Sequence, residues 1–431
     1  MGKLEPWPKL QQRLRHRIRA FAYHFHGTCT DAALKLEETG TAMYDVIVAG
    51  AGPAGASAAH VLALGGARVL LLEAARMPRY KPCGGGITAR ARAASPLIAS
   101  YPMETSASTM LIPGGKEEVR CPLPASVGMV MRAQFDAHLV ARAVDAGAEL
   151  RDGTALAAVE EFSPGQSRVR AGADTVTARY VIGADGANGI TARLAGFPPL
   201  TRIAAAIEVE LAVPDRAQER YREAVLLDLL CIKDGYGWIF GKADHLSVGL
   251  GIFHGNSKPD LRAALARFLV THADLRGGKV LLQRGYRIPL AGGRRVRRRG
   301  RVLLAGDAAA LADPLTAEGI SYALASGRRA GAAMLTALRT GPDALAGYDR
   351  YLTRELCGDL HYARLVAALS YRFPDLVVRL ASESQTLRAA NTAAVAGTAD
   401  YRSLVLRMAT KTPKLVRALL ARGGSGPLYQ G

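Results

Sequence analysis

The stretch from Tyr44 to Ala75 limits the possible folds of this chain more than any other, because it reads as a strand, a glycine turn, a helix and a second strand without interruption. Residues Val46–Val48 are apolar on both faces, which is typical of a parallel strand that is covered on both sides. Pro53 suits the first turn of a helix, where a missing N–H is no loss. The stretch therefore predicts a βαβ unit of a Rossmann-type parallel sheet.

The turn in this unit spells G-x-G-x-x-G, and each glycine has a physical task. Gly50 permits the tight turn, Gly52 lets the backbone approach a pyrophosphate, and Gly55 lets helix and strand pack closely. Glu73 follows about twenty residues later, at the end of the second strand, where a carboxylate can bind the two hydroxyls of an adenosine ribose. A plain glycine-rich turn would leave Glu73 unexplained, so we predict a dinucleotide site. Its predicted contacts are Gly50, Gly52, Pro53, Ala54, Gly55, Glu73 and Ala74.

Length and composition exclude several classes of protein. The chain has 431 residues, enough for two or three structural units. It has no uncharged apolar run of about 18 residues, so no membrane-spanning helix is predicted. Arginines interrupt the only region where the apolar core of a secretory signal would lie. We therefore expect a cytoplasmic protein. The interrupting residues are Arg13, Arg15, Arg17 and Arg19.

The formal net charge of +19 suggests an anionic partner. Nucleic acid, an anionic membrane surface and an acidic protein all fit such a charge. No RNP, zinc-finger or helix-turn-helix pattern accompanies it. The membrane surface, at its inner face, and an acidic electron-donor protein are therefore favoured, and no nucleic acid is expected.

The cysteines are scattered and include no C-x-x-C pair. This spacing argues against a zinc site, an iron–sulfur cluster and a disulfide framework. We predict no metal site. The five cysteines are Cys29, Cys83, Cys121, Cys231 and Cys357.

A second glycine-rich segment, RYKPCGGGI, spans Arg79–Ile87. Its three consecutive glycines let the backbone pass close to something flat or charged. Cys83 stands between a cation, Lys81, and these glycines. A plain turn is the alternative, but the position directly after the dinucleotide fingerprint favours contact with a cofactor.

Two kinds of segment alternate in the middle of the chain. Residues 110–124 and several short runs between 203 and 252 predict antiparallel strands with one covered face, crossed by a helix over 259–273. Between them, residues 131–146 predict a helix, and residues 159–182 predict a β-meander. The meander ends in a glycine-rich turn around Asp185, which gives a cofactor a second place of approach.

Three aromatic residues, Tyr236, Trp238 and Phe240, alternate along one predicted strand and therefore share a face. An aromatic stripe of this kind usually belongs to a core. It can equally wall a long apolar cavity, and the spacing does not distinguish these two interpretations.

A third motif, VLLAGDAAALADPLTAEGI, occupies residues 302–320. It predicts a buried strand, a Gly-Asp turn, a proline loop and a helix from about Glu318 to Leu338. Asp307 can bind the ribityl hydroxyls of a flavin, and the positive end of the helix dipole would favour an anionic reduced flavin. The predicted contacts are Gly306, Asp307, Pro314, Gly319 and Ile320.

Residues 345–422 alternate apolar and basic at helical spacing, with breaks at Pro374 and near Pro413. We predict a helical C-terminal region that closes over the second domain. Its cationic end suits either an interfacial helix or a helix packed on its own protein.

Taken together, these motifs resemble the geranylgeranyl reductase family of FAD-dependent flavoproteins, which share the para-hydroxybenzoate hydroxylase-like fold. The resemblance runs from Tyr44 to about Leu338. The fingerprint and the Gly306-Asp307 motif belong to the whole FAD fold, whereas the Cys-Gly-Gly loop and the Tyr-x-Trp-x-Phe stripe are narrower. The family's stripe usually ends in proline, where this chain has Gly241.

The resemblance implies positions for the cofactor and the substrate. It implies FAD bound through Glu73 at the adenosine ribose, through Arg132 and the Asp185 turn near the pyrophosphate, and through Asp307 at the flavin. It also implies that Cys83 lies near the flavin and that Tyr236 and Trp238 line a tunnel for an isoprenoid chain. These last three residues are the candidate catalytic residues.

The predicted fold class is α/β (α+β overall). It combines a Rossmann-type FAD-binding domain with a parallel sheet, an antiparallel-sheet substrate domain and a helical C-terminal region. Residues 1–43 form an N-terminal extension, which is a disordered or functional segment or the product of a mis-assigned start before Met43. The predicted FAD-binding segments are 44–85, 125–195 and 288–344, the substrate-domain segments are 86–124 and 196–287, and the C-terminal region is 345–431.

The implied activity is reduction of carbon–carbon double bonds in an isoprenoid lipid or prenyl diphosphate by hydride transfer from reduced flavin. An unactivated alkene has no carbonyl to polarise, so placement in a dry slot should supply most of the rate. The electron donor is NADPH or reduced ferredoxin, and water or a tyrosine supplies the proton. An FAD-dependent monooxygenase (hydroxylase) or halogenase is the alternative, and an electron-transfer flavoprotein is disfavoured because iron–sulfur cysteines are lacking.

Overall fold

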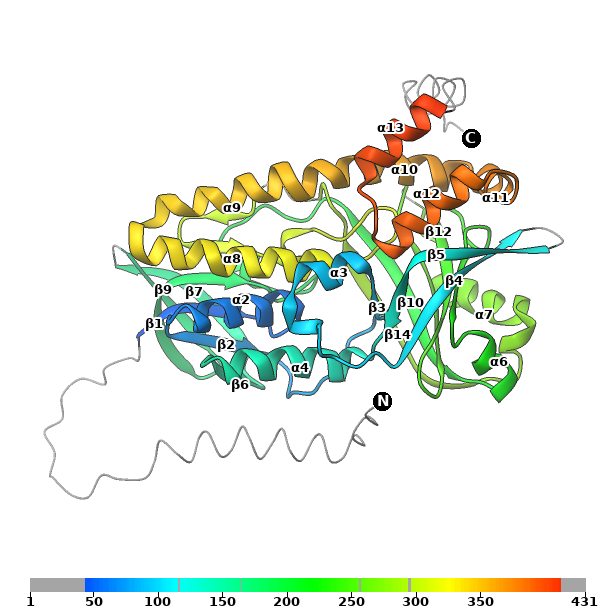
Figure 1. Cartoon of the computed structure of the whole chain (residues 1–431). Helices are drawn as coiled ribbons and strands as arrows, with labels where there is room; N and C mark the ends of the chain where they lie inside the picture. The colour runs from blue at the N-terminus through cyan, green and yellow to red at the C-terminus, as the bar shows by residue number, and fades with distance from the viewer. Residues whose placement is uncertain (1–42, 115–116, 164, 256, 294–295, 412–431) are drawn as a thin grey trace, which may run out of the picture.

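A computed structural model describes residues 43–114, 117–163, 165–255, 257–293 and 296–411 (Figure 1). The predictions made for residues 1–42, for Cys29 and for the segment from residue 412 onward, including Pro413, lie outside these ranges. Two eight-stranded sheets form the two halves of the described molecule, and helices cover both of them. The predicted mixed α/β class with a helical C-terminal region is confirmed.

The first sheet carries the fingerprint. Its order is β15-β16-β9-β1-β2-β6, and β8 adds to β9 and pairs with β7. β1 lies between β9 and β2 and pairs in parallel with both, and its residues Val46–Ala49 are buried, as its continuous apolarity predicts. The strands are β1 (Met43–Ala49), β2 (Val69–Glu73), β6 (Glu149–Asp152), β7 (Leu156–Ser163), β8 (Gln166–Ala171), β9 (Asp174–Gly183), β15 (Arg298–Arg299) and β16 (Val302–Leu304).

The second sheet has the order β14-β10-β13-β12-β11-β4-β5-β3 and is antiparallel except where β11 meets β4. Its strand β5 continues to Met129, beyond the limit of residue 124 expected for the first substrate-domain segment. The strands are β3 (Gly86–Ile87), β4 (Thr105–Gly114), β5 (Glu117–Met129), β10 (Ile203–Ala212), β11 (Ala224–Asp228), β12 (Gly235–Gly241), β13 (Leu246–Ile252) and β14 (Lys279–Pro289).

Separate apolar clusters bury the two faces of the second sheet. On one face, Val209 and Val248 pack under helix α7 (Leu261–Thr271), as the predicted crossing helix requires. On the other face, Met110 and Val225 pack against Val378 of α11 (Pro374–Glu383). The C-terminal helices therefore cover the second face of this sheet.

Helices α2 (Pro53–Leu64) and α8 (Ile320–Thr340) pack together beside the first sheet. The C-terminal helices then run across to the second sheet (Figure 1). The break predicted at Pro374 is present, since α11 begins there, and further breaks at Ser384 and Gly397 were not predicted. The remaining helices are α3 (Ala89–Ala94), α4 (Arg132–Asp145), α5 (Thr191–Leu194), α6 (Asp215–Arg220), α9 (Ala346–Tyr351), α10 (Cys357–Arg372), α11 (Pro374–Glu383), α12 (Gln385–Ala396) and α13 (Tyr401–Lys411).

Within the described ranges, every helix is too short or too polar to cross a bilayer.

Candidate functional site

The glycine turn between β1 and α2 is closed by backbone contacts. Gly50 has φ +99°, and a Cβ there would lie 2.4 Å from the Ala184 carbonyl oxygen. A Cβ at Gly55 would lie 1.8 Å from the Gly50 carbonyl oxygen. At Gly52, by contrast, a Cβ would meet only an Arg79 nitrogen at 3.7 Å. The turn is thus rigid on its protein side and open on the side where Gly52 begins the helix.

A cavity of about 410 Å³ adjoins this turn and is lined by Gly50, Gly52, Glu73, Ala74 and Asp185. The structure thus brings together predicted residues that are separated by up to 135 positions. Glu73 Oε2 accepts from the Ala51 amide at 3.0 Å, which fixes the carboxylate at the end of β2.

Asp185 lies in the wall of this cavity, and only one of its two carboxylate oxygens has a hydrogen-bond partner among the described residues. Its Oδ2 accepts from the Thr191 amide at 2.8 Å. Its Oδ1 is buried and has no hydrogen-bond partner among the described residues. Burial raises the pKa of this carboxyl, although the amide hydrogen bond opposes the shift. A buried acceptor of this kind suits a ligand that brings a donor.

Three charged side chains that the sequence did not connect tie the first cavity to α4. Asp136 is fully buried and accepts from Arg132 through two bonds of 2.8 Å and from Arg79 at 2.9 Å. Arg79 also contacts Glu73 Oε2 at 3.2 Å. Arg132 was expected near the pyrophosphate. Its guanidinium donates to Asp136, and the residue also lines the second cavity. Its structural partner was missed because Asp136 has no motif of its own.

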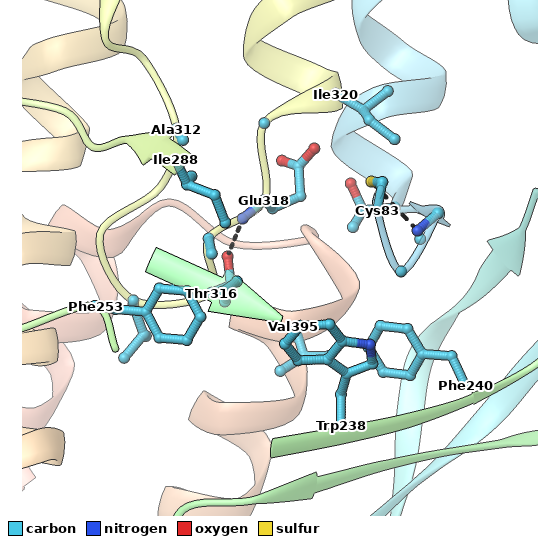
Figure 2. A pocket seen from close by; sticks show the side chains of 18 of the residues that line it. Cys83, Trp238, Phe240, Phe253, Ile288, Ala312, Thr316, Glu318, Ile320 and Val395 are labelled. Atoms are coloured by element: carbon cyan, nitrogen blue, oxygen red, sulfur yellow. Dashed lines mark hydrogen bonds between the residues drawn. The ribbon is translucent and has the colours of Figure 1, made fainter. Parts of the chain in front are cut away.

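The second cavity, of about 280 Å³, is lined by Gly52 and Gly306 and extends to helix α12, which contributes Ala394 and Val395 to its lining. Figure 2 shows Cys83, Trp238, Phe240 and Val395 around it. The aromatic stripe therefore walls a cavity. Of the predicted residues, this cavity is lined by Gly52, Pro53, Ala54, Cys83, Arg132, Tyr236, Trp238, Gly306, Asp307, Gly319 and Ile320.

The candidate catalytic residues line this cavity and differ in the hydrogen bonds that their side chains form. Cys83 Sγ accepts from the Gly85 amide at 3.4 Å (Figure 2). The Tyr236 hydroxyl donates to the Thr316 carbonyl at 2.5 Å. Trp238 Nε1 is buried and has no partner among the described residues. The indole nitrogen is therefore a buried donor that no described residue satisfies.

The third motif joins the first at the mouth of the second cavity. A Cβ at Gly306, which has φ +61°, would lie 2.9 Å from the Ala54 Cβ, so the two glycine turns touch. Asp307 lies beside Lys81 Nζ at 3.3 Å. Gly319 is the N-cap of the 21-residue helix α8 and lines the cavity, and the Ser321 amide in the first turn of that helix donates to Glu318 Oε1 at 2.7 Å.

Two predicted cofactor residues support the site without lining either cavity. Gly55 lies against Gly50, and Pro314 belongs to the loop before α8. That loop is shaped by the fully buried Asp313, whose Oδ1 accepts from the amides of Leu315 and Thr316. Asp313 was quoted in the motif but not predicted as a site residue.

Two buried acids on β10, Glu208 and Glu210, were also missed. A signal for them existed, because two carboxylates at a spacing of two stand in an otherwise apolar strand. Glu208 lines the second cavity.

Known families and proteins share sequence similarity with this chain. An FAD binding domain model matches residues 43–94 and 100–230. Geranylgeranyl diphosphate reductase of Rhodobacter capsulatus is 34% identical over 319 residues, covering 70% of this chain and 77% of the relative. Digeranylgeranylglycerophospholipid reductase 1 of Methanopyrus kandleri is 33% identical, covering 72% and 85%. The chain belongs to the geranylgeranyl reductase family. It is an FAD-dependent oxidoreductase.

Other relatives of this geranylgeranyl reductase family member have different names. Menaquinone reductase of Mycolicibacterium smegmatis is 30% identical, covering 80% of this chain and 89% of the relative. A geranylgeranyl bacteriochlorophyll reductase-like structure from Thermoplasma acidophilum has a TM-score of 0.75 at 23% identity and covers 89% of this chain and all of its own. A flavin-dependent brominase has a TM-score of 0.66 at 18% identity, covering 86% and 100%. These structures share the fold.

The residues present fit an FAD. The open face of Gly52 and the free amides of α2 suit a pyrophosphate, and the orphaned Asp185 Oδ1 suits a donor group of the dinucleotide. Glu73 lies at the far wall of the first cavity, and the start of α8 faces the second. The two cavities share the lining residues Gly52, Ala184 and Gly186, so they adjoin at the glycine turn.

Proposed function

We propose that this protein reduces carbon–carbon double bonds of an isoprenoid chain carried by a lipid or a prenyl diphosphate. The observation that carries the proposal is the apolar chamber that continues from the flavin loops into the second sheet. Its far walls come from β4, β5, β11 and α12, and they contain Met110, Ile112, Val127, Met129, Val225, Leu227 and Val395.

The chamber suits a long apolar chain because apolar side chains make up its far walls. The Cys-Gly-Gly loop touches the aromatic stripe, since a Cβ at Gly84 would lie 2.7 Å from the Phe240 ring. Bound FAD in its reduced form would supply the two electrons and one hydrogen. The protein's own task is then to hold the alkene and exclude water, and Trp238 and Phe240 are the side chains placed to do so.

The substrate carrier and the electron donor belong to the same proposal. The names of the relatives suggest a prenyl diphosphate, an isoprenoid glycerophospholipid or an isoprenoid quinone. NADPH or reduced ferredoxin supplies the electrons, and the net charge of +19 supports an acidic donor protein.

One anaerobic experiment tests the function. The holoenzyme is reduced with dithionite and mixed with geranylgeranyl diphosphate, a digeranylgeranylglycerophospholipid or menaquinone, and the products are analysed by mass spectrometry. We expect a gain of two hydrogens per reduced double bond without oxygen. Turnover that strictly requires oxygen would instead support a monooxygenase or halogenase, as the brominase-like fold allows.

Narrowing the chamber should change which chain lengths are reduced. Val395 of α12 projects into the chamber, so Val395→Trp is expected to raise the KM for geranylgeranyl diphosphate by about 10-fold or more, because overpacking costs about 1–3 kcal/mol. Geranyl diphosphate should be affected less. Ala389→Trp on the exposed face of the same helix is the control, and an equal effect of both variants would contradict the chamber.

Association with an anionic membrane surface is a further part of the proposal, supported by the net charge and by the apolar nature of the substrate. Binding to phosphatidylglycerol liposomes should weaken as salt rises, because exposed charges are screened beyond about 10 Å at 0.1 M salt. Flotation across a salt series measures this, and binding that salt does not change would count against an electrostatic surface.

A further inference from the structure

A line of hydrogen-bonded titratable side chains joins the protein surface to the second cavity. It begins at Asp244, whose side chain is 86% exposed and whose Oδ1 lies 2.6 Å from His245 Nδ1. His245 Nε2 lies 3.1 Å from Glu210 Oε2. The Tyr80 hydroxyl lies 3.1 Å from Glu210 Oε1 and 2.8 Å from Glu208 Oε1. Glu208 forms part of the cavity wall.

The sequence builds this line from three separate segments. Glu208 and Glu210 stand two residues apart on β10 and share the face opposite to Val209, which packs into the core under α7. His245 immediately precedes β13, the antiparallel neighbour of β10. Tyr80 comes from the loop that carries Cys83, and the Cys83 amide donates to Glu208 Oε1 at 2.8 Å. The line therefore ends at the loop of the proposed reaction site.

The Tyr80 hydroxyl has one proton and two carboxylates as partners. It can donate to only one of them at a time, so a proton on the other carboxyl completes the network. Each of these oxygens can therefore pass a proton to its neighbour without rearrangement of the backbone.

Among the described residues, Glu208 has no direct cation partner of the kind that Asp136 has. Asp136 has two guanidiniums, whereas the hydrogen bonds that described residues give to Glu208 come from Tyr80 and Cys83. Burial, followed by the charge of Glu210, raises the pKa of Glu208 to about 7. Lys242 opposes that shift from a buried position where its Nζ binds the Gly84 and Val130 carbonyls.

We propose that Asp244, His245, Glu210, Tyr80 and Glu208 form a proton relay that carries one proton from solvent to the reaction cavity for each double bond reduced. The inference rests on the proposed function. It supplies the second hydrogen of the reduction, for which the sequence offered water or a tyrosine without choosing. Tyr236 is a poor alternative because its hydroxyl donates to Thr316 and burial raises its pKa.

The step balances in protons and electrons. Two electrons and one hydrogen come from the reduced cofactor, and the Glu208 carboxyl gives up the second hydrogen as a proton to the other alkene carbon. Tyr80 then passes its proton to Glu208 and takes one from Glu210. His245 Nε2 then reprotonates Glu210 Oε2, His245 Nδ1 takes a proton from Asp244, and the exposed Asp244 takes one from solvent. Glu208 is the catalytic acid, and the other four are relay residues.

The test uses single turnovers of the dithionite-reduced holoenzyme with the probe, among the three named above, that the wild type reduces. Glu208→Gln should slow flavin reoxidation by about 100-fold or more, the usual contribution of a general acid. Tyr80→Phe and His245→Ala should slow it by at least about 10-fold, with FAD content and visible spectrum unchanged. Imidazole added to His245→Ala should restore the rate, an effect that a structural role of His245 would not produce.

Asp228→Asn is the matched control. Asp228 is also a buried acid of the second sheet beside a histidine, 3.4 Å from His272, but it lines neither cavity. Its substitution should leave the single-turnover rate unchanged.

The pH profile gives a second readout. The donating form is the acid, so the wild-type rate should fall as pH rises through about 7, the raised pKa of Glu208. The charged or titratable groups that act on this carboxyl are Tyr80, Glu210 and Lys242, and Arg284 lies opposite it on β14. Because Gln does not titrate, Glu208→Gln should lose the fall near pH 7.

The outcomes separate the relay from the function. If the wild type reduces none of the three probes, the proposed function fails and the relay falls with it. If the wild type turns over and Glu208→Gln keeps its rate and pH profile, the relay alone is overturned. If Glu208→Gln does not fold, Tyr80→Phe and His245→Ala decide: full rates without imidazole in both would overturn the proposal.

Discussion

Gly55→Ala is expected to yield a protein that does not retain FAD. The added methyl would lie 1.8 Å from the Gly50 carbonyl oxygen, and no flexible side chain stands there to move aside. Gly50 itself is fixed, because its own Cβ position is filled by the backbone of Ala184 and Asp185. Helix α2 would have to move away from β1, at a cost of about 3 kcal/mol or more. The turn that faces the pyrophosphate would move with it.

The FAD-to-protein ratio after purification, and after incubation with added FAD, measures this effect. Gly358→Ala is the matched control, because Gly358 is also helical and its added methyl would meet only the Thr353 carbonyl oxygen at 3.8 Å. We expect it to retain FAD and to be more stable by up to about 1 kcal/mol, since alanine favours a helix. A Gly55→Ala protein that binds FAD stoichiometrically would show that close packing at this glycine is not required.

The sequence predicts the parts of the fold that are determined by residues close to one another in the chain. The fingerprint around Gly50 works because turn, helix start and strand are all set by neighbours within about thirty residues. The close approach of Gly306 to Ala54 was not predicted, because the two motifs are far apart in the sequence. The stripe around Trp238 was placed on one strand face, but its spacing could not decide whether a cavity lies beside it.

The parts that the sequence leaves open depend on contacts between distant segments. Arg79 reaches an acid 57 positions away, and nothing near Asp136 marks it as a partner. Tyr80 lies 128 residues from Glu208, so the line from the surface appears only when β10 and the cysteine loop are folded together. The roof formed by α12 was predicted as helix, but which face it covers depends on packing rather than on periodicity.

Asp136→Asn should destabilise the protein by about 3–5 kcal/mol, because it leaves the buried guanidinium of Arg132 and the partly buried guanidinium of Arg79 without their shared counter-charge. Asp136 is fully buried, and its bonds to Arg132 and Arg79 join α4 to the Glu73 carboxylate. Thermal unfolding of the holoenzyme, followed by flavin fluorescence and by circular dichroism, measures the loss. Weaker FAD retention should accompany it, since Arg79 holds Glu73.

Asp145→Asn supplies the control on the same helix. Asp145 forms a 3.8 Å pair with Arg142 in which both side chains are about half exposed, so its loss should cost less than about 1 kcal/mol.

The pH dependence of the Asp136 effect follows from the sign of the shift. Burial alone would raise the pKa of Asp136, but Arg132 and Arg79 outweigh it and hold that pKa below its ordinary value. The stabilisation is therefore complete above the unfolded pKa of about 4 and is lost as pH falls through the lower folded pKa. The gap between wild type and Asp136→Asn should be widest near pH 7 and should narrow in acid. A gap that stays constant from pH 7 to pH 3 would mean that the charge of Asp136 is not what holds α4 to the flavin site.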